Sequence, residues 1–248
     1  MIGKRDPRAA AGMTAMLVEF GRKQACVALI AATGMFLLAG AADAASCRNG
    51  EADIDVRIDN EAVKIDHSRS VAELSNRGGA ALGPALGLTV ATPRSEISSR
   101  FEWQEDEKTG DIHCLRTTDV KAAIGAVNRI VHIAREFPRG SCEYREILQH
   151  EYKHVATDER LVRDLGRRLR VSLRAALSRS RPPARLRAAD SKDALAAIRS
   201  TLQRVLDEAS DRLAVERRRN HAEIDTRAEY ERVGAACGRD SLFRKVAG

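Results

Sequence analysis

The hydrophobic pattern of this 248-residue chain changes its period near residue 141. Between residues 52 and 134, apolar residues come in short alternating stretches, which are typical of β-strands with one buried face. From Glu143 onward, apolar residues recur at steps of three, four or seven, and charged residues fill the positions between them. That spacing predicts amphipathic α-helices. The two patterns together predict an α+β fold.

The strand-like part, residues 46–140, is expected to form a small antiparallel sheet. Alternating residues from 52 to 66, with Asp59-Asn60 as a turn signal between them, predict a short hairpin. Further strands are expected at 88–91, 100–104 and 112–117, with a turn at 108–111, and at 122–134 as one strand or two.

The helical part, residues 141–248, is expected to hold two long antiparallel helices and to share one domain with the strands. The first helix should begin at Ser141 or Cys142 and end in the segment 178–190, which contains two consecutive prolines. The second should run from about Ser191 to Ala236.

The N-terminal residues 1–45 have the three parts of a secretory signal peptide. Arg22 and Lys23 precede an apolar run at 25–40, and Ala42-Asp43-Ala44 provides a small-x-small cleavage pattern. The apolar run is shorter than the ~20 residues that a membrane span needs. We therefore expect export to the periplasm or the extracellular space. The competing interpretation is an uncleaved membrane anchor.

Cysteine usage agrees with export. Cys26 lies inside the apolar run and should be removed with it. The remaining cysteines form an even set that suggests two disulfides in an oxidising compartment: Cys47, Cys114, Cys142 and Cys237. Three pairings are open. Antiparallel helices would bring Cys142 and Cys237 together, which would leave Cys47 for Cys114.

The motif His150-Glu151-Tyr152-Lys153-His154 carries the chemistry of the chain. Histidines four residues apart on a helix project from one face, where two neutral imidazoles can bind one Zn²⁺ ion. Glu151 lies beside them and can accept a proton from a zinc-bound water. This is the HExxH pattern of zinc hydrolases. The alternative is a solvated helix face with two unrelated histidines.

A catalytic zinc site also needs a third protein ligand. Asp158 lies one turn after His154, but three ligands on one straight helix converge poorly. The second helix offers His221, Asp225 and Glu229 at steps of four. Asp225 and Glu229 are the preferred candidates, and the choice between them is open. The competing interpretation is an exposed charged face.

The segments 130–138, 140–144 and 148–154 resemble a bacterial family of exported proteins of unknown function that are regarded as zinc-dependent peptidases. The resemblance implies a metallopeptidase-like fold. Members of that family often carry an Asp-x-x-Thr-x-His-Gly pattern near the end. This chain keeps Asp225 but replaces the other three positions of the pattern with Ala228, Tyr230 and Glu231.

Ten arginines lie between Arg160 and Arg187. Nucleic acid is not an expected partner, because the protein is predicted to be exported and aromatic residues are not interleaved with the arginines. An anionic envelope surface fits this charge better. A solvated helix face followed by a linker also explains it.

Two functions follow from these patterns. The first is a secreted or periplasmic zinc metallopeptidase with peptide or protein substrates. The second is a non-enzymatic envelope protein that uses its two helices for partner binding and carries a vestigial or structural metal site.

Overall fold

The computed structural model describes residues 50–78 and 83–243. Within these residues the chain forms a mixed sheet and α-helices, which confirms the predicted α+β class. The predicted signal peptide, residues 1–45, lies outside the described residues. Of the helices in the described part, none combines the length and the apolarity that crossing a membrane requires.

The sheet is built around one long strand, β4 (Ile112–Ile133). β3 (Gly87–Glu105) pairs with it antiparallel, and the predicted turn at 108–111 joins the two. Each of these strands is continuous where the sequence suggested separate pieces. The hairpin is long because Ile124 and its alternate neighbours on β4 face a helical layer along its length.

The other edge of β4 pairs with three shorter strands. β1 (Asp53–Ile58) and β2 (Lys64–Asp66) run parallel to β4, and β5 (Arg185–Leu186) runs antiparallel to it. The sheet is therefore mixed, and the prediction of a purely antiparallel sheet is wrong in this detail.

The predicted hairpin at residues 52–66 is also wrong, since β1 and β2 pair with β4 and continue in one direction. The segment between them stays on the edge of β4, where the Asp59 N–H donates to the Ile124 carbonyl at 2.9 Å and the Ala126 N–H donates to Asn60 Oδ1 at 2.9 Å. A Cβ at Gly125 would lie 1.9 Å from the Asp59 carbonyl oxygen, so glycine permits this close approach.

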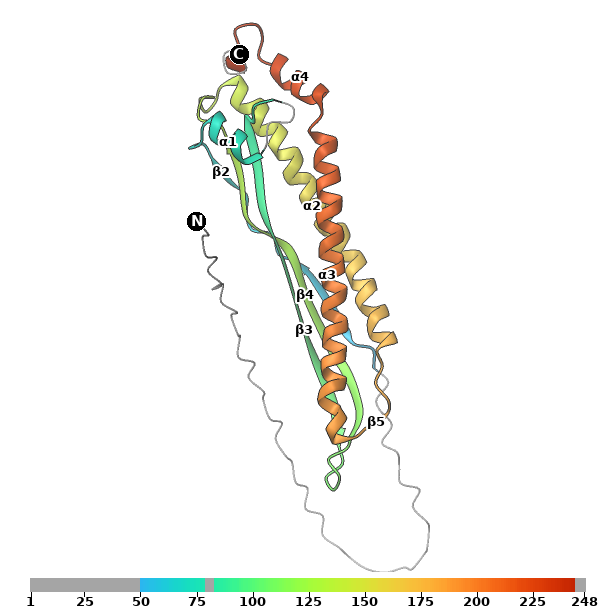
Figure 1. Ribbon diagram of the computed structural model, residues 1–248. Helices are drawn as coiled ribbons and strands as arrows, with labels where there is room; N and C mark the ends of the chain where they lie inside the picture. The colour runs from blue at the N-terminus through green and yellow to red at the C-terminus, as the bar shows by residue number, and fades with distance from the viewer. Residues whose placement is uncertain (1–49, 79–82, 244–248) are drawn as a thin grey trace, which may run out of the picture. The chain divides into compact units, whose positions relative to one another are not determined.

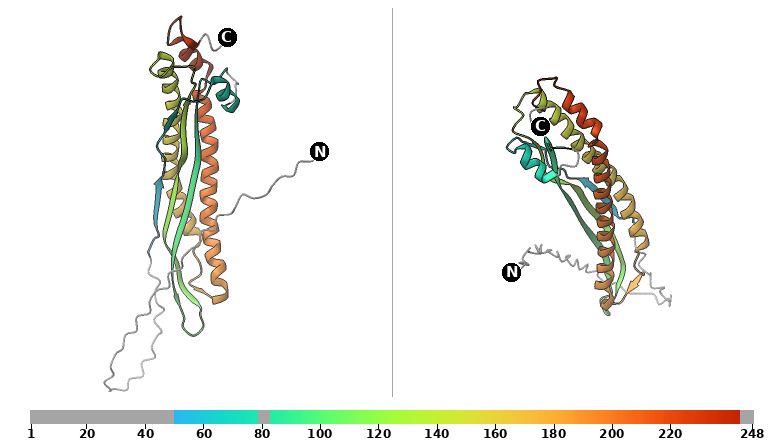
Figure 2. Two further views of the ribbon diagram at one scale, coloured as in Figure 1. Left: turned by 90° about the vertical axis from the view of Figure 1, so that its left-hand side faces the viewer. Right: turned by 45° about the horizontal axis from the view of Figure 1, so that its top comes forward.

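Two long antiparallel helices pack against one face of the sheet (Figures 1 and 2). α2 (Cys142–Arg179) begins as predicted, and the Ser141 hydroxyl caps it by accepting the Tyr144 N–H at 3.0 Å. α3 (Ser191–Ile224) returns alongside α2. Leu169 and Leu202, one from each helix, are fully buried in the core that they share with β1 and β4.

The predicted second helix is interrupted. α3 ends at Ile224, and a separate short helix, α4 (Arg227–Ala235), follows. Thr226 caps α4 by accepting the Glu229 N–H at 3.2 Å. This break turns the chain so that α4 contacts the N-terminal part of α2. The short helix α1 (Val71–Gly78) contributes Leu74 to a second core that also contains residues of α2 and α4.

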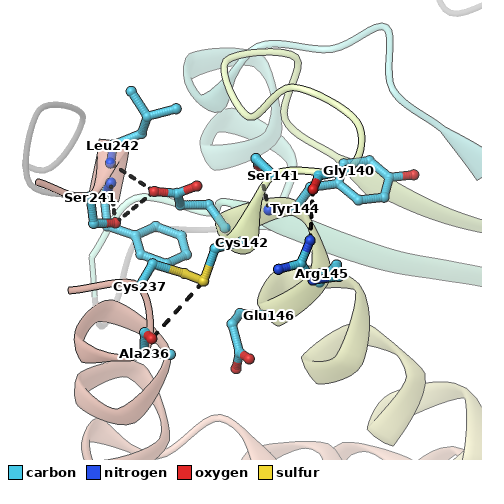
Figure 3. The surroundings of a disulfide bond; sticks show 12 residues. Gly140, Ser141, Cys142, Tyr144, Arg145, Glu146, Ala236, Cys237, Ser241 and Leu242 are labelled. Carbon is cyan, nitrogen blue, oxygen red and sulfur yellow. Dashed lines mark hydrogen bonds between the residues drawn. A yellow bond between two sulfur atoms is a disulfide. The ribbon is translucent and has the colours of Figure 1, made fainter.

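A disulfide joins Cys142 at the start of α2 to Cys237 just after α4, with a Cα–Cα distance of 5.7 Å (Figure 3). Nearby, Glu143 accepts the Ser241 hydroxyl at 2.9 Å and the Leu242 N–H at 3.0 Å. The contact expected between these two cysteines is confirmed. The pairing of Cys47 with Cys114 stays a prediction, because Cys47 lies outside the described residues.

Candidate metal centre

His150 and His154 project from the same face of α2 into the interior. Both are buried, at 9% and 5% exposure, and their Nε2 atoms lie 3.4 Å apart. Lone pairs on two neighbouring buried imidazoles repel one another unless a proton or a cation lies between them. The helix therefore presents two nitrogen donors towards one point.

Asp225 brings a third donor to the same point. It caps the C-terminus of α3 at the break before α4, and its Oδ1 atom lies 3.2 Å from His150 Nε2 and 3.0 Å from His154 Nε2. Ligands at about 2.0–2.1 Å from a tetrahedral zinc ion would lie about 3.3–3.4 Å from one another. The three observed separations are close to this spacing, so the two nitrogens and the oxygen fit a zinc ion.

Glu229 lies outside this group of three atoms. Its Oε1 atom accepts Lys153 Nζ at 2.6 Å and Arg232 Nη2 at 2.9 Å, and it lies 3.3 Å from His150 Nδ1. Arg232 is the main cause that holds the Glu229 pKa far below its usual range. A carboxylate on the far nitrogen of a histidine fixes the orientation of the ring.

Glu151 is buried beside the two histidines, at the point where α2 approaches β3. The Thr89 hydroxyl donates to Glu151 Oε2 at 2.8 Å. A Cβ at Gly87 would lie 2.5 Å from Glu151 Oε1, so only glycine leaves room for this carboxylate. Burial raises the pKa of Glu151, while the bond from Thr89 opposes that shift. The group is thus shielded from bulk water yet adjacent to the donor atoms.

Charges around the donor atoms are strongly coupled. Burial acts to lower the pKa of His150, but its hydrogen bonds with Asp225 and Glu229 and the charge of Glu151 raise it overall. Burial acts to raise the pKa of Asp225, but hydrogen bonds from His150 and His154 hold it far below its usual range. Asp225 is therefore an anion beside the two histidines.

His221 and Asp158, the two less favoured ligand candidates, bond to each other. His221 Nε2 lies 2.7 Å from Asp158 Oδ1, and Arg217 Nε donates to the same oxygen at 2.8 Å. The His221 ring centroid lies 4.6 Å from that of His154. His221 and Asp158 therefore lie beside the three donor atoms and contribute no atom to that group.

His154 Nδ1 is buried and has no hydrogen-bond partner among the residues that the structure describes. Nε2 is therefore the nitrogen of this ring that faces polar atoms, and it faces Asp225 and His150. The position of Nε2 beside Asp225 and His150 favours a role for His154 in holding a cation through this atom.

Three residues of the site were not singled out as functional from the sequence: Gly87, Thr89 and Tyr230. The Tyr230 ring centroid lies 5.9 Å from that of His150. Burial, together with the charges of Asp225 and Glu151, raises the Tyr230 pKa, so the phenol remains a proton donor. The capping spacing from Thr226 to Glu229 was a signal for the helix break, and hence for the placement of Tyr230.

Comparisons of the chain with protein-family models, with curated proteins and with solved structures found no match.

Proposed function

We propose that the chain is an exported zinc-dependent hydrolase that cleaves peptide bonds. The observation that supports this most strongly is the convergence of His150 Nε2, His154 Nε2 and Asp225 Oδ1, with a buried carboxylate next to them. Three protein ligands leave one position for water, as in catalytic zinc sites. In this proposal Asp225 is the third ligand, and Glu229 orients His150.

When bound, zinc would lower the pKa of a coordinated water and polarise the substrate carbonyl. The chain's own residues supply the proton transfers. Glu151 accepts a proton from the attacking water as the water oxygen adds to the carbonyl carbon. It then gives that proton to the leaving nitrogen as the C–N bond breaks.

The surroundings of Glu151 favour its role as the group that accepts and returns the proton. Thr89 holds Oε2, which leaves Oε1 available for the water proton. Because burial raises its pKa, the carboxylate is a stronger base than an exposed one. Tyr230 lines the same pocket as His150 and Glu151, and its protonated phenol can donate a hydrogen bond to the substrate.

The test is hydrolysis of a defined peptide mixture, followed by mass spectrometry, with the wild-type protein and the Glu151→Gln variant. We expect cleavage by the zinc-loaded wild type and a loss of about 10²–10⁴-fold in the variant. Equal cleavage by both proteins would refute the role of Glu151. No cleavage by a wild type that also lacks zinc would favour the non-enzymatic envelope protein.

A further inference from the structure

A pocket of ≈290 Å³ opens directly beside His150 and Glu151. Ligand pockets usually span about 300–1,000 Å³, so this one matches a single side chain better than a large ligand. Its walls are mainly apolar and come from the loop before β3, from α2, from α4 and from the C-terminal segment: Pro84, Leu86, Ile147, Val233 and Phe243.

The walls are firmly held. Ile147 and Phe243 are buried in the second core, and Phe243 packs against Phe137 with ring centroids 5.3 Å apart. The hydrogen bonds from Ser241 and Leu242 to Glu143 anchor the segment that carries Phe243 (Figure 3). The cavity is therefore a formed feature of this end of the molecule.

A glycine of α4 leaves part of this space open. A Cβ added at Gly234 would meet no atom within 4 Å, although the residue lines the pocket. An added side chain at this position therefore starts in open space at the edge of the pocket.

The charge of the lining restricts the occupant. Among the residues that the structure describes, the lining contains no lysine or arginine, and its acidic group is Glu151. The nearby cations Lys153 and Arg232 are both paired with Glu229. An anionic side chain would lie next to the Glu151 carboxylate in a partly apolar site, which is costly.

We propose that this pocket is a specificity subsite that receives an uncharged apolar side chain, of leucine or phenylalanine size, from the residue next to the cleaved bond. The inference rests on the proposed function, because it takes His150 and Glu151 as the reacting end of the pocket. Contact with five apolar walls supplies the binding energy through burial of that side chain.

Hydroxamates test this directly, because the same group binds zinc in every probe and only the attached chain differs. The probes are acetohydroxamate, 4-methylpentanohydroxamate, 3-phenylpropanohydroxamate, glutarate monohydroxamate and 6-aminohexanohydroxamate, titrated calorimetrically into the zinc-loaded protein. Burial of the added apolar group should tighten binding of the second and third probes by about 10- to 100-fold over acetohydroxamate. The two charged probes should gain much less affinity over acetohydroxamate.

Two variants of Gly234 locate the effect, and a variant of Ala228 is their control. Gly234→Leu should remove most of the gain for 3-phenylpropanohydroxamate and leave acetohydroxamate binding unchanged. Gly234→Ala, which adds one carbon, should give a smaller loss in the same direction. Ala228→Leu adds a leucine side chain at an exposed position of α4. It should change neither the affinity for acetohydroxamate nor the gain in affinity for 3-phenylpropanohydroxamate.

The possible failures are distinguishable. A protein that binds no zinc and no acetohydroxamate would refute the proposed function, and the subsite with it. A protein that binds all five hydroxamates equally would keep the metal centre and overturn the subsite alone. Tightest binding of the cationic or the anionic probe would overturn its apolar character.

Discussion

Asp225 Oδ1 lies 3.0 Å from His154 Nε2, although 71 residues separate the two along the chain. The same oxygen lies 3.2 Å from His150 Nε2. This convergence depends on the break between α3 and α4, because Asp225 occupies the C-cap of α3. The candidate centre is therefore a product of the tertiary fold as well as of the HExxH motif.

The two acidic candidates should differ in their effect on zinc affinity. Asp225→Ala removes an atom of the donor group and should lower the affinity more than Glu229→Ala does. Loss of a residue that orients a metal ligand typically costs about 10–100-fold, which is the range expected for Glu229→Ala. Competition with a zinc chelator measures both, and Glu223→Ala, at an exposed position of α3, is the control. A larger loss for Glu229→Ala would reverse the assignment.

The Cys142–Cys237 disulfide should stabilise both the fold and the candidate centre. It closes a loop with a sequence separation of 95 and ties α2 to the end of α4. Replacing both cysteines with serine should lower the free energy of unfolding by about 2–5 kcal/mol, in a mechanism dominated by unfolded-chain entropy. Urea denaturation measures this. Zinc affinity should fall as well, since α4 follows Asp225 directly. An unchanged midpoint of urea denaturation would contradict the stabilising role of the disulfide.

Asp158 should contribute stability that depends on pH. Burial acts to raise its pKa, but hydrogen bonds from His221 and Arg217 lower it below the ordinary 3.8. A carboxyl whose pKa is lowered by folding contributes stability above its unfolded pKa, and this is lost as the pH falls through the folded value. Asp158→Asn should therefore cost about 1.5–3 kcal/mol at pH 7. The difference from wild type should shrink below pH 4, as measured by chemical denaturation. A difference independent of pH would contradict the charge-based account.

The α+β class and α2 could be predicted because they depend on local patterns. The apolar spacing after Glu143 and the cap at Ser141 together define where α2 lies. The disulfide between Cys142 and Cys237 then followed from the antiparallel arrangement of the helices. These features need no knowledge of long-range strand pairing.

The sheet direction and the helix break were harder to predict. Alternation at residues 52–66 reports which face of a strand is buried, but not which partner it pairs with, so parallel pairing with β4 was missed. The apolar spacing of α3 obscured the cap at Thr226, and with it the turn that carries Asp225 and Tyr230 to α2. The sequence left Asp225 and Glu229 as alternatives because their separation depends on that turn.

The zinc content of the purified protein tests the central claim most directly. We predict one zinc ion per chain in the wild type by elemental mass spectrometry. We expect its loss in His150→Ala and His154→Ala, since two remaining ligands hold zinc weakly, and its retention in Glu151→Gln, since that residue is not a ligand in this account. Circular dichroism of each variant controls for folding. A folded wild type that purifies without zinc, and binds none at micromolar concentration, would contradict the account.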